Sequence, residues 1–170
     1  MRNMARLSIM CGLPYSGKTT LQKELVKRLG LQVVSVDRIM DEKDMWREGH
    51  PTQEDWDAAY SEAYRQIKEY LKEGKKVIFD CANLPFHERE NARKIADSLG
   101  ITHQLIYVNT SKEDILRRRQ ENEQTKERGH LDREMMDNAF NMFNEPTESE
   151  HPIIYNHRVN VDDWIELHFH

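Results

Sequence analysis

Eight consecutive residues near the start of the chain have the types and spacing that bind phosphate. Residues 12–19 follow the pattern G-x-x-x-x-G-K-[ST] in full. Backbone N–H groups of such a loop, together with the N-terminus of the following helix, converge on phosphate oxygens, and the helix dipole favours their negative charge. We expect the phosphates of a bound nucleotide to contact nine residues: Gly12, Leu13, Pro14, Tyr15, Ser16, Gly17, Lys18, Thr19 and Thr20.

Four of these residues have distinct predicted roles. Gly12 and Gly17 permit backbone angles and close approaches that a Cβ atom would block. Lys18 is expected to reach the outer phosphates as a positive point charge, and the hydroxyl of Thr19 to contact Mg²⁺. The alternative is a glycine-containing turn that binds nothing. The complete motif, with an apolar strand before it and a helix after it, favours phosphate binding.

Two aspartates at the predicted ends of apolar strands are further candidates for the site. Asp37 follows the valine-rich segment 32–36, and Asp80 follows the apolar segment 77–79. Ligands of open α/β folds bind where the strands end. Asp37 can accept the proton of a substrate hydroxyl, and Asp80 can hold Mg²⁺ directly or through water. The alternatives are a helix-capping aspartate at position 37 and an ordinary turn residue at position 80.

An arginine-rich segment, residues 117–133, is predicted to form a mobile lid over the phosphates. It begins with Arg117, Arg118 and Arg119 and also contains Arg128. Arginine side chains that close over a phosphoryl group stabilise the negative charge that develops during its transfer. An ordinary charged surface helix is the alternative on composition alone. The sequence leaves open which of the four arginines contacts phosphate.

Short apolar runs alternate with longer segments of helical periodicity, which is typical of βαβ units around a parallel sheet. Strands are predicted over residues 7–11, 32–36, 76–81 and 103–108, with a fifth, edge-like strand at 158–161. Helices are predicted over 18–29, 56–71 and 92–99, after an N-cap at Ser111, and from an N-cap at Asp132 to a stop at Pro146. The expected fold class is α/β, with a mostly parallel five-stranded sheet and helices on both faces.

Length and composition restrict the class of protein further. The 170 residues predict one domain, 1–170. No apolar stretch approaches the roughly 18–20 residues of a membrane span, and no signal peptide is recognised, so we expect no membrane partner and a cytoplasmic location. The net charge of −5 argues against a dedicated nucleic-acid-binding protein. Two cysteines are too few for a disulfide scaffold.

Together these motifs resemble the AAA_33-like small P-loop kinases, which are related to the kinase domain of polynucleotide kinase, to zeta-toxin-like proteins and to chloramphenicol-phosphotransferase-like proteins. The phosphate loop is similar to the family's G-x-P-G-S-G-K-[ST], residues 80–84 to its D-x-T-N-L, and residues 143–147 to its F-x-x-P-[T] segment. The resemblance extends from the first strand to Glu150. It implies a P-loop NTPase fold with the strand order 2-3-1-4-5, Asp37 as general base, and Arg118 and Arg128 as lid arginines.

Three positions depart from the family pattern. Tyr15 stands where the family usually has glycine, which predicts a stiffer loop or a ring that covers the acceptor side. Ala82 replaces the usual threonine. Met40 stands where polynucleotide kinases have an arginine that meets substrate phosphate. The expected acceptor site, residues 38–58, also contains the segment 41–57, where two bases and seven acids give 2 − 7 = −5 and would repel a phosphate backbone.

The sequence therefore predicts a kinase that uses ATP and Mg²⁺ to phosphorylate a hydroxyl group of a small-molecule or nucleoside-like acceptor. Lys18, Asp37, Arg118 and Arg128 are the expected catalytic residues. One alternative is a 5′-hydroxyl polynucleotide or RNA kinase. Another is a switch that hydrolyses ATP slowly and signals to a protein partner; because a switch needs no acceptor base, Asp37 favours the kinase. The acceptor, the ATP or GTP preference and the oligomeric state stay open.

Overall fold

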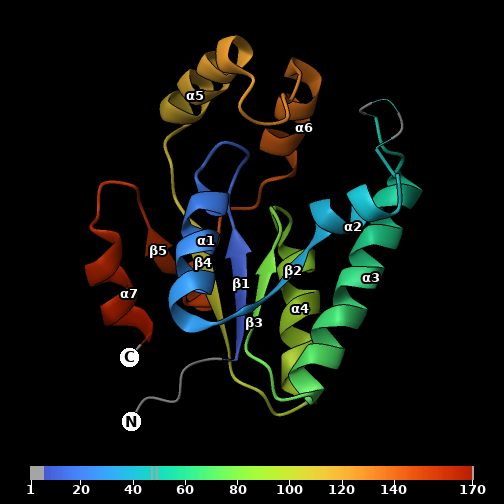
Figure 1. Cartoon of the computed structure of the whole chain (residues 1–170), viewed down its shortest axis with the longest axis vertical. Helices are drawn as coiled ribbons and strands as arrows, with labels where there is room; N and C mark the ends of the chain where they lie inside the picture. Colours follow the sequence, from blue (N-terminus) through green and yellow to red (C-terminus); the bar gives the residue numbers. More distant parts are fainter. Residues whose placement is uncertain (1–5, 47, 49, 170) are drawn as a thin grey trace.

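A five-stranded parallel sheet forms the centre of the protein in the computed structural model, which describes residues 6–46, 48 and 50–169 (Figure 1). The strands are β1 (Leu7–Cys11), β2 (Gln32–Ser35), β3 (Val77–Asp80), β4 (His103–Val108) and β5 (Ile153–Tyr155). Their order is β2-β3-β1-β4-β5, and the four pairings between these strands are all parallel. The α/β fold class and the strand order 2-3-1-4-5 are therefore confirmed.

Helices cover both faces of this sheet (Figure 1). The described helices are α1 (Lys18–Leu29), α2 (Val36–Glu42), α3 (Gln53–Lys72), α4 (Phe86–Ser98), α5 (Lys112–Thr125), α6 (Arg133–Met142) and α7 (Val161–Phe169). Successive strand residues point to opposite faces, so Ile9 packs with α2, α3 and α4, whereas Met10 packs with α1 and α7. Burial on both faces explains why the central strands β1 and β3 are nearly continuous apolar runs.

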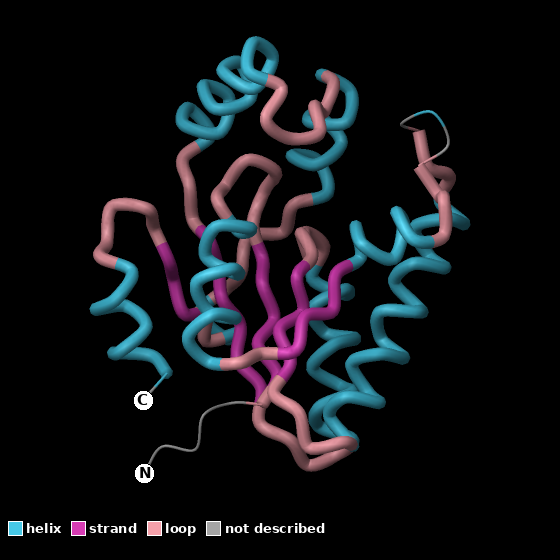
Figure 2. Tube along the Cα trace, viewed as in Figure 1, coloured by secondary structure: helices cyan, strands magenta, loops and turns pink. Residues whose placement is uncertain are grey.

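The helices α5 and α6 stand together beyond the ends of the strands (Figures 1 and 2). The loop that follows β1 lies beneath them, and its Tyr15 packs in a small apolar cluster with Ile115 of α5 and Met136 of α6. The arginine-rich segment thus extends over the carboxyl edge of the sheet. Among the described helices, none combines the length and apolar character needed to cross a bilayer.

Local capping contacts set the starts of several helices. The Ser111 hydroxyl accepts a hydrogen bond from Asp114 N (3.1 Å), and the Asp132 carboxylate accepts one from Met135 N (2.8 Å), which confirms both predicted N-caps. Helix α3 begins at Gln53, three residues before the predicted helix 56–71, which was defined by the spacing of its apolar residues. Its first turn is stabilised by reciprocal hydrogen bonds between Thr52 and Asp55.

Three predicted strands have other bounds in the structure. The third strand, predicted over 76–81, is one residue shorter at each end, Val77–Asp80. The fifth strand is Ile153–Tyr155, which pairs with β4, rather than residues 158–161. The side chains of Asn156 and Asn160 accept hydrogen bonds from Arg158 N and Asp162 N, both at 2.9 Å, and these contacts turn the chain into α7. The second strand ends at Ser35, because the Ser35 hydroxyl accepts from Arg38 N (3.2 Å) and starts a helix there. Asp37 therefore lies in the first turn of α2 rather than at the end of β2.

Candidate active site

The loop between β1 and α1 has a geometry that suits an anion. A Cβ atom on Gly12 would lie 2.8 Å from Ser16 Oγ and 3.0 Å from the Val108 carbonyl oxygen, so only glycine fits there. Gly17, the N-cap of α1, has φ of +101°. The Ser16 hydroxyl is buried and has no hydrogen-bond partner in the described part of the chain. A phosphate oxygen at this helix N-terminus would supply that partner, so the loop fits nucleotide phosphates.

The Lys18 ammonium group lies across the phosphate loop. Its Nζ donates hydrogen bonds to the carbonyl oxygens of Gly12 (2.7 Å) and Leu13 (3.0 Å). Burial lowers the pKa of Lys18, and the negative charges of Asp80 and, more weakly, Asp37 oppose that shift. The cation therefore interacts with the loop, with Asp80 at the end of β3 and, more weakly, with Asp37 in the first turn of α2.

Asp37 and Asp80 lie at one edge of the sheet, where β2 and β3 end. Ser35 pairs with Asp80 in the parallel ladder, and Asp37 follows two residues later. Burial raises the pKa of each carboxyl group, and the positive charge of Lys18 opposes both shifts. Asp37 is in contact with solvent, yet enough protein surrounds its carboxylate to disfavour the charged form.

No hydrogen bond or ion pair to these two carboxylates is found among the described residues. The helix-capping interpretation of Asp37 is wrong, because the N-cap of α2 is Ser35. Asp37 is instead a carboxylate that is available to a ligand, beside a second carboxylate and a lysine. This arrangement can accept a proton from a hydroxyl group and can hold a cation.

Thr19 and Asp80 are the residues that could hold Mg²⁺. Thr19 is exposed in the first turn of α1, and Asp80 is half-buried at the end of β3. Within the described ranges, no group of three or more His, Cys, Asp or Glu side chains could bind a metal ion by itself. Mg²⁺ usually has one or two protein ligands and takes the others from substrate phosphates and water. The residues present therefore fit an ion that binds together with a nucleotide.

A pocket of about 560 Å³ opens beside the phosphate loop, and both predicted lid arginines line it. Arg118 reaches the loop directly, since its Nη1 donates a hydrogen bond to the Tyr15 carbonyl oxygen (3.0 Å). The lining comes from three parts of the chain: the loop and α1 (Tyr15, Ser16, Gly17, Thr20), the lid (Arg118, Glu121, Asn122, Thr125, Glu127, Arg128) and the segment that begins at the end of β5 (Tyr155, His157). Its size is that of a typical small-ligand site.

The other two arginines of the run 117–119 have different partners. Arg117 pairs with Asp114 and Glu121 on its own helix, and Arg119 pairs with Glu123. Successive helical residues point about 100° apart, so only one of three adjacent arginines can face the loop. Arg118 is that residue.

Tyr155 and His157 are pocket residues that the sequence analysis does not identify. They lie in or near β5, where the strand was predicted in the wrong place, and no motif marks them. Asn122 was also missed; its side chain donates to Arg128 O (3.1 Å) and accepts from Arg128 N (3.1 Å), so it fixes the backbone of a lid arginine. Only the tertiary contacts distinguish it from its polar neighbours on α5.

The loop after β3 is held in place by buried polar contacts. Asn83 has φ of +48°, a conformation that asparagine adopts more readily than most residues, and its Nδ2 donates to Met10 O (2.7 Å). Gly12 N donates to Ala82 O (3.1 Å). These bonds connect the segment 80–84 to β1 and to the phosphate loop, and they hold Asp80 beside that loop.

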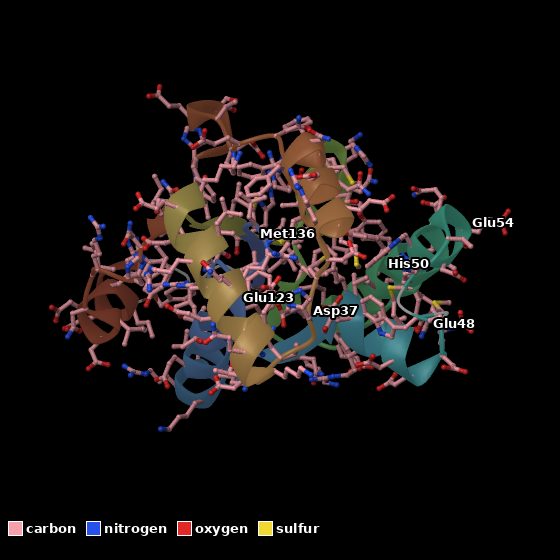
Figure 3. All side chains as sticks on the ribbon, turned by 90° about the horizontal axis from the view of Figure 1, so that it is seen from above. Asp37, Glu48, His50, Glu54, Glu123 and Met136 are labelled. Atoms are coloured by element: carbon pink, nitrogen blue, oxygen red, sulfur yellow. The ribbon has the colours of Figure 1, made fainter. Side chains whose placement is uncertain are left out.

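Most residues of the segment 41–57, which was expected to form part of the acceptor site, are exposed to solvent. Glu48, His50 and Glu54 group at one edge of the molecule, away from Asp37 (Figure 3). Asp41 is the acid of this segment that influences the site, because its charge raises the pKa of Asp37. Arg47 of the same segment lies outside the described residues.

Two departures from the family pattern also take definite positions. Met40 is fully buried in the core, so its side chain offers no contact to an acceptor. The ring of Tyr15 packs against Ile115 of α5 and Met136 of α6.

The chain matches the sequence model of the AAA_33 family, described as an AAA domain, over residues 7–146. No curated protein matches the chain. Among solved structures, an unliganded sugar kinase from Janibacter sp. HTCC2649 has a TM-score of 0.72 at 19% identity, with 96% of this chain and 91% of that chain covered. A gluconokinase from Sinorhizobium meliloti 1021 has a TM-score of 0.71 at 14% identity, with 99% and 91% covered.

Kti12 from Chaetomium thermophilum, in complex with ADP-AlF3, has a TM-score of 0.74 at 20% identity, with 96% of this chain and 99% of that chain covered. At such identities these likenesses establish the fold alone. The family match is broader evidence, because it spans the phosphate loop, Asp37, Asp80 and the predicted lid arginines. Phosphate loop, parallel sheet and family match agree, and the chain belongs to the AAA_33 family of P-loop proteins.

Proposed function

We propose that this protein is a kinase that transfers the γ-phosphoryl group of ATP to a hydroxyl group of a small-molecule or nucleoside-like acceptor. The main support is the position of two carboxylates, Asp80 at the end of β3 and Asp37 just after the adjacent end of β2, next to the phosphate loop whose carbonyls Lys18 contacts. A nucleotide-dependent switch needs the loop and one metal-binding acid. Asp37 gives the site a second carboxylate, available to an acceptor, for which a switch has no use.

In the proposed reaction the acceptor oxygen forms a bond to the γ-phosphorus while the bond from that phosphorus to the β–γ bridging oxygen breaks. ADP leaves, and the hydroxyl proton passes to the Asp37 carboxylate. Its raised pKa makes Asp37 a stronger base than an ordinary aspartate. Lys18 neutralises charge on the outer phosphates, and Arg118 and Arg128 stabilise the phosphoryl group in transfer. Most of the rate gain then comes from positioning and electrostatics.

Thr19 and Asp80 would hold Mg²⁺ in this proposal, and the ion would neutralise charge on the β- and γ-phosphates. A cation beside Asp80 would also offset the desolvation that raises the pKa of its carboxyl group. The protein's own contribution is to orient the carboxylate through the hydrogen-bonded loop that follows β3.

The acceptor class is proposed from charge and from the structural neighbours. The chain has a net charge of −5, and the position of the expected phosphate-binding arginine is occupied by the buried Met40. Two of the similar structures are named as a sugar kinase and a gluconokinase. Small polyhydroxylated compounds are therefore the first acceptors to test. A 5′-hydroxyl polynucleotide or RNA is the alternative, and net negative charge disfavours it.

The test is ATP consumption by the purified protein with Mg²⁺ and a panel of sugars, sugar acids, other alcohols, nucleosides and 5′-hydroxyl oligonucleotides, with products identified by mass spectrometry. We expect one small acceptor to accelerate ATP loss and to be recovered as its phosphate ester. Asp37→Asn should abolish both effects while ATP still binds. Asp163→Asn, exposed in the first turn of α7 and outside the expected acceptor segment, is the matched control and should change neither.

Other outcomes of the panel would contradict the proposal. ATP loss that no acceptor changes would favour the switch. Fastest turnover with oligonucleotides would favour the polynucleotide kinase.

A further inference from the structure

Tyr15 has a backbone conformation that its side chain makes unfavourable. It lies in the phosphate loop with φ of +63°, in the left-handed region that glycine adopts freely and bulky residues avoid. A glycine at this position would carry no such strain. A tyrosine here needs compensating contacts, and its side chain is nearly fully buried.

The main compensating contacts come from α5, from α6 and from the loop that joins these two helices. The Tyr15 phenol oxygen accepts a hydrogen bond from Leu131 N (3.1 Å) and lies 3.5 Å from Gly129 O, at the outer limit for a donated bond. The ring packs against Ile115 and Met136, the buried residues that α5 and α6 contribute to this cluster. A residue of the phosphate loop is therefore bound to both lid helices and to the loop that joins them.

The lid arginines are attached through the same residue. Arg118 donates to the Tyr15 carbonyl oxygen (3.0 Å), and the Arg128 guanidinium lies 6.0 Å from the centre of the Tyr15 ring. Asn122 holds the Arg128 backbone from the other side. The position of both arginines at the pocket thus depends on Tyr15 and on α5.

We propose that Tyr15 is a positioning residue that couples the phosphate loop to the lid, so that phosphate binding at the loop tightens the lid through the phenol. In a loop with glycine at this position, no side chain would connect the two parts. Here the phenol connects the lid backbone at Gly129 and Leu131 to the phosphate loop. The effect on catalysis rests on the proposed function, whereas the tether itself does not.

The first test measures amide hydrogen exchange in the nucleotide-free protein. Tyr15→Phe keeps the ring and removes the acceptor of the Leu131 amide, so exchange at Leu131 should rise about fivefold, the factor expected for one typical net hydrogen bond. Tyr15→Gly, which also relieves the backbone, should raise exchange across residues 128–132. Tyr70→Phe, at the opposite end of α3 from the lid, is the matched control and should leave it unchanged (Figure 1). Unchanged exchange at Leu131 in both Tyr15 variants would overturn the tether.

The second test measures the coupling, which a merely structural role would not alter. Saturating ADP should slow exchange in residues 12–19 and in residues 128–132 of the wild-type protein. In Tyr15→Phe the protection of the loop should persist while that of the lid falls. Equal lid protection in both proteins would overturn the coupling. A wild-type protein that ADP protects nowhere would contradict the proposed function instead, and the first test would still decide the tether.

Discussion

The Arg89 guanidinium and the Glu150 carboxylate form two parallel hydrogen bonds, of 2.8 and 2.9 Å, with side chains that are 0% and 3% exposed. Arg89 also donates from Nη1 to the carbonyl oxygens of Asn83 and Leu84, both at 3.0 Å. A residue pair 61 positions apart thus supports the loop that follows Asp80. The pair contributes to the site indirectly, by fixing the backbone from which the proposed metal ligand projects.

Loss of this pair should destabilise the protein strongly. Glu150→Gln leaves the buried Arg89 cation without its counter-charge, and breaking a buried pair in this way costs about 3–5 kcal/mol. Urea unfolding should show this loss. Glu62→Gln, which breaks an exposed pair with Arg65, is the control and should cost less than about 1 kcal/mol. Equal effects of the two substitutions would contradict a special role for the buried pair.

Removal of the Lys18 ammonium group should abolish nucleotide turnover with little loss of stability. The group interacts with the loop carbonyls and with Asp37 and Asp80 rather than with the apolar core. We expect Lys18→Ala to reduce turnover by at least about 10²-fold, the effect of deleting one charge-stabilising donor. Lys23→Ala, exposed on the same helix, should behave as the wild type. Unchanged ATP affinity and turnover in Lys18→Ala would refute the phosphate-binding assignment.

The rate should depend on pH through Asp37. The proposed base acts when ionised, so kcat/KM should rise with pH through its pKa, which burial raises from the ordinary aspartate value. The acidic limb of the profile should therefore lie at higher pH than an ordinary aspartate, with a pKa of about 3.9, would give. Asp37→Asn should lower kcat/KM by about 10²-fold or more and remove that limb. A profile that is flat down to pH 4 would contradict this role.

The folded protein should be less stable with Asp80 ionised than with Asp80 protonated. The pKa of Asp80 is higher in the folded chain than in the unfolded chain, where it is 3.8. The stabilisation by protonated Asp80 is therefore complete below pH 3.8 and is lost as pH rises through the pKa of the folded state. At pH 7 without nucleotide or metal, Asp80→Asn should therefore raise Tm slightly, by on the order of 1–3 °C. The gain should shrink as pH is lowered toward 4. A lower Tm for Asp80→Asn at pH 7 would contradict the burial argument.

Phosphorylation of 5′-hydroxyl oligonucleotides should be weak or absent at physiological salt. The net charge is −5, and the buried Met40 provides no phosphate contact. Because Glu48 and Glu54 lie away from Asp37 (Figure 3), Glu48→Gln and Glu54→Gln should leave acceptor selection unchanged. Radiolabel transfer to an oligonucleotide, measured against salt concentration, checks this. Efficient transfer that falls as salt rises would support the polynucleotide kinase.

The phosphate loop and most of the sheet could be predicted from the sequence because they depend on neighbouring residues. The loop functions through the backbone of a continuous segment, and Gly12 and Gly17 stand where a Cβ or a right-handed backbone would not fit. The central strands are buried on both faces, so each is an apolar run. The helices that follow Ser111 and Asp132 start with capping hydrogen bonds between residues only three positions apart.

Other features depended on contacts between distant residues. The edge strand Ile153–Tyr155 is buried less than the central strands, so its composition is a weak signal, and pairing with β4 defines it. The choice of Arg118 over its neighbours depends on the direction in which α5 faces the loop. The pairing of Arg89 with Glu150, and of Tyr15 with the lid, brings together residues 61 and 116 positions apart. The types of the residues alone do not predict such contacts, because burial and hydrogen-bond partners are set only when the helices pack on the sheet.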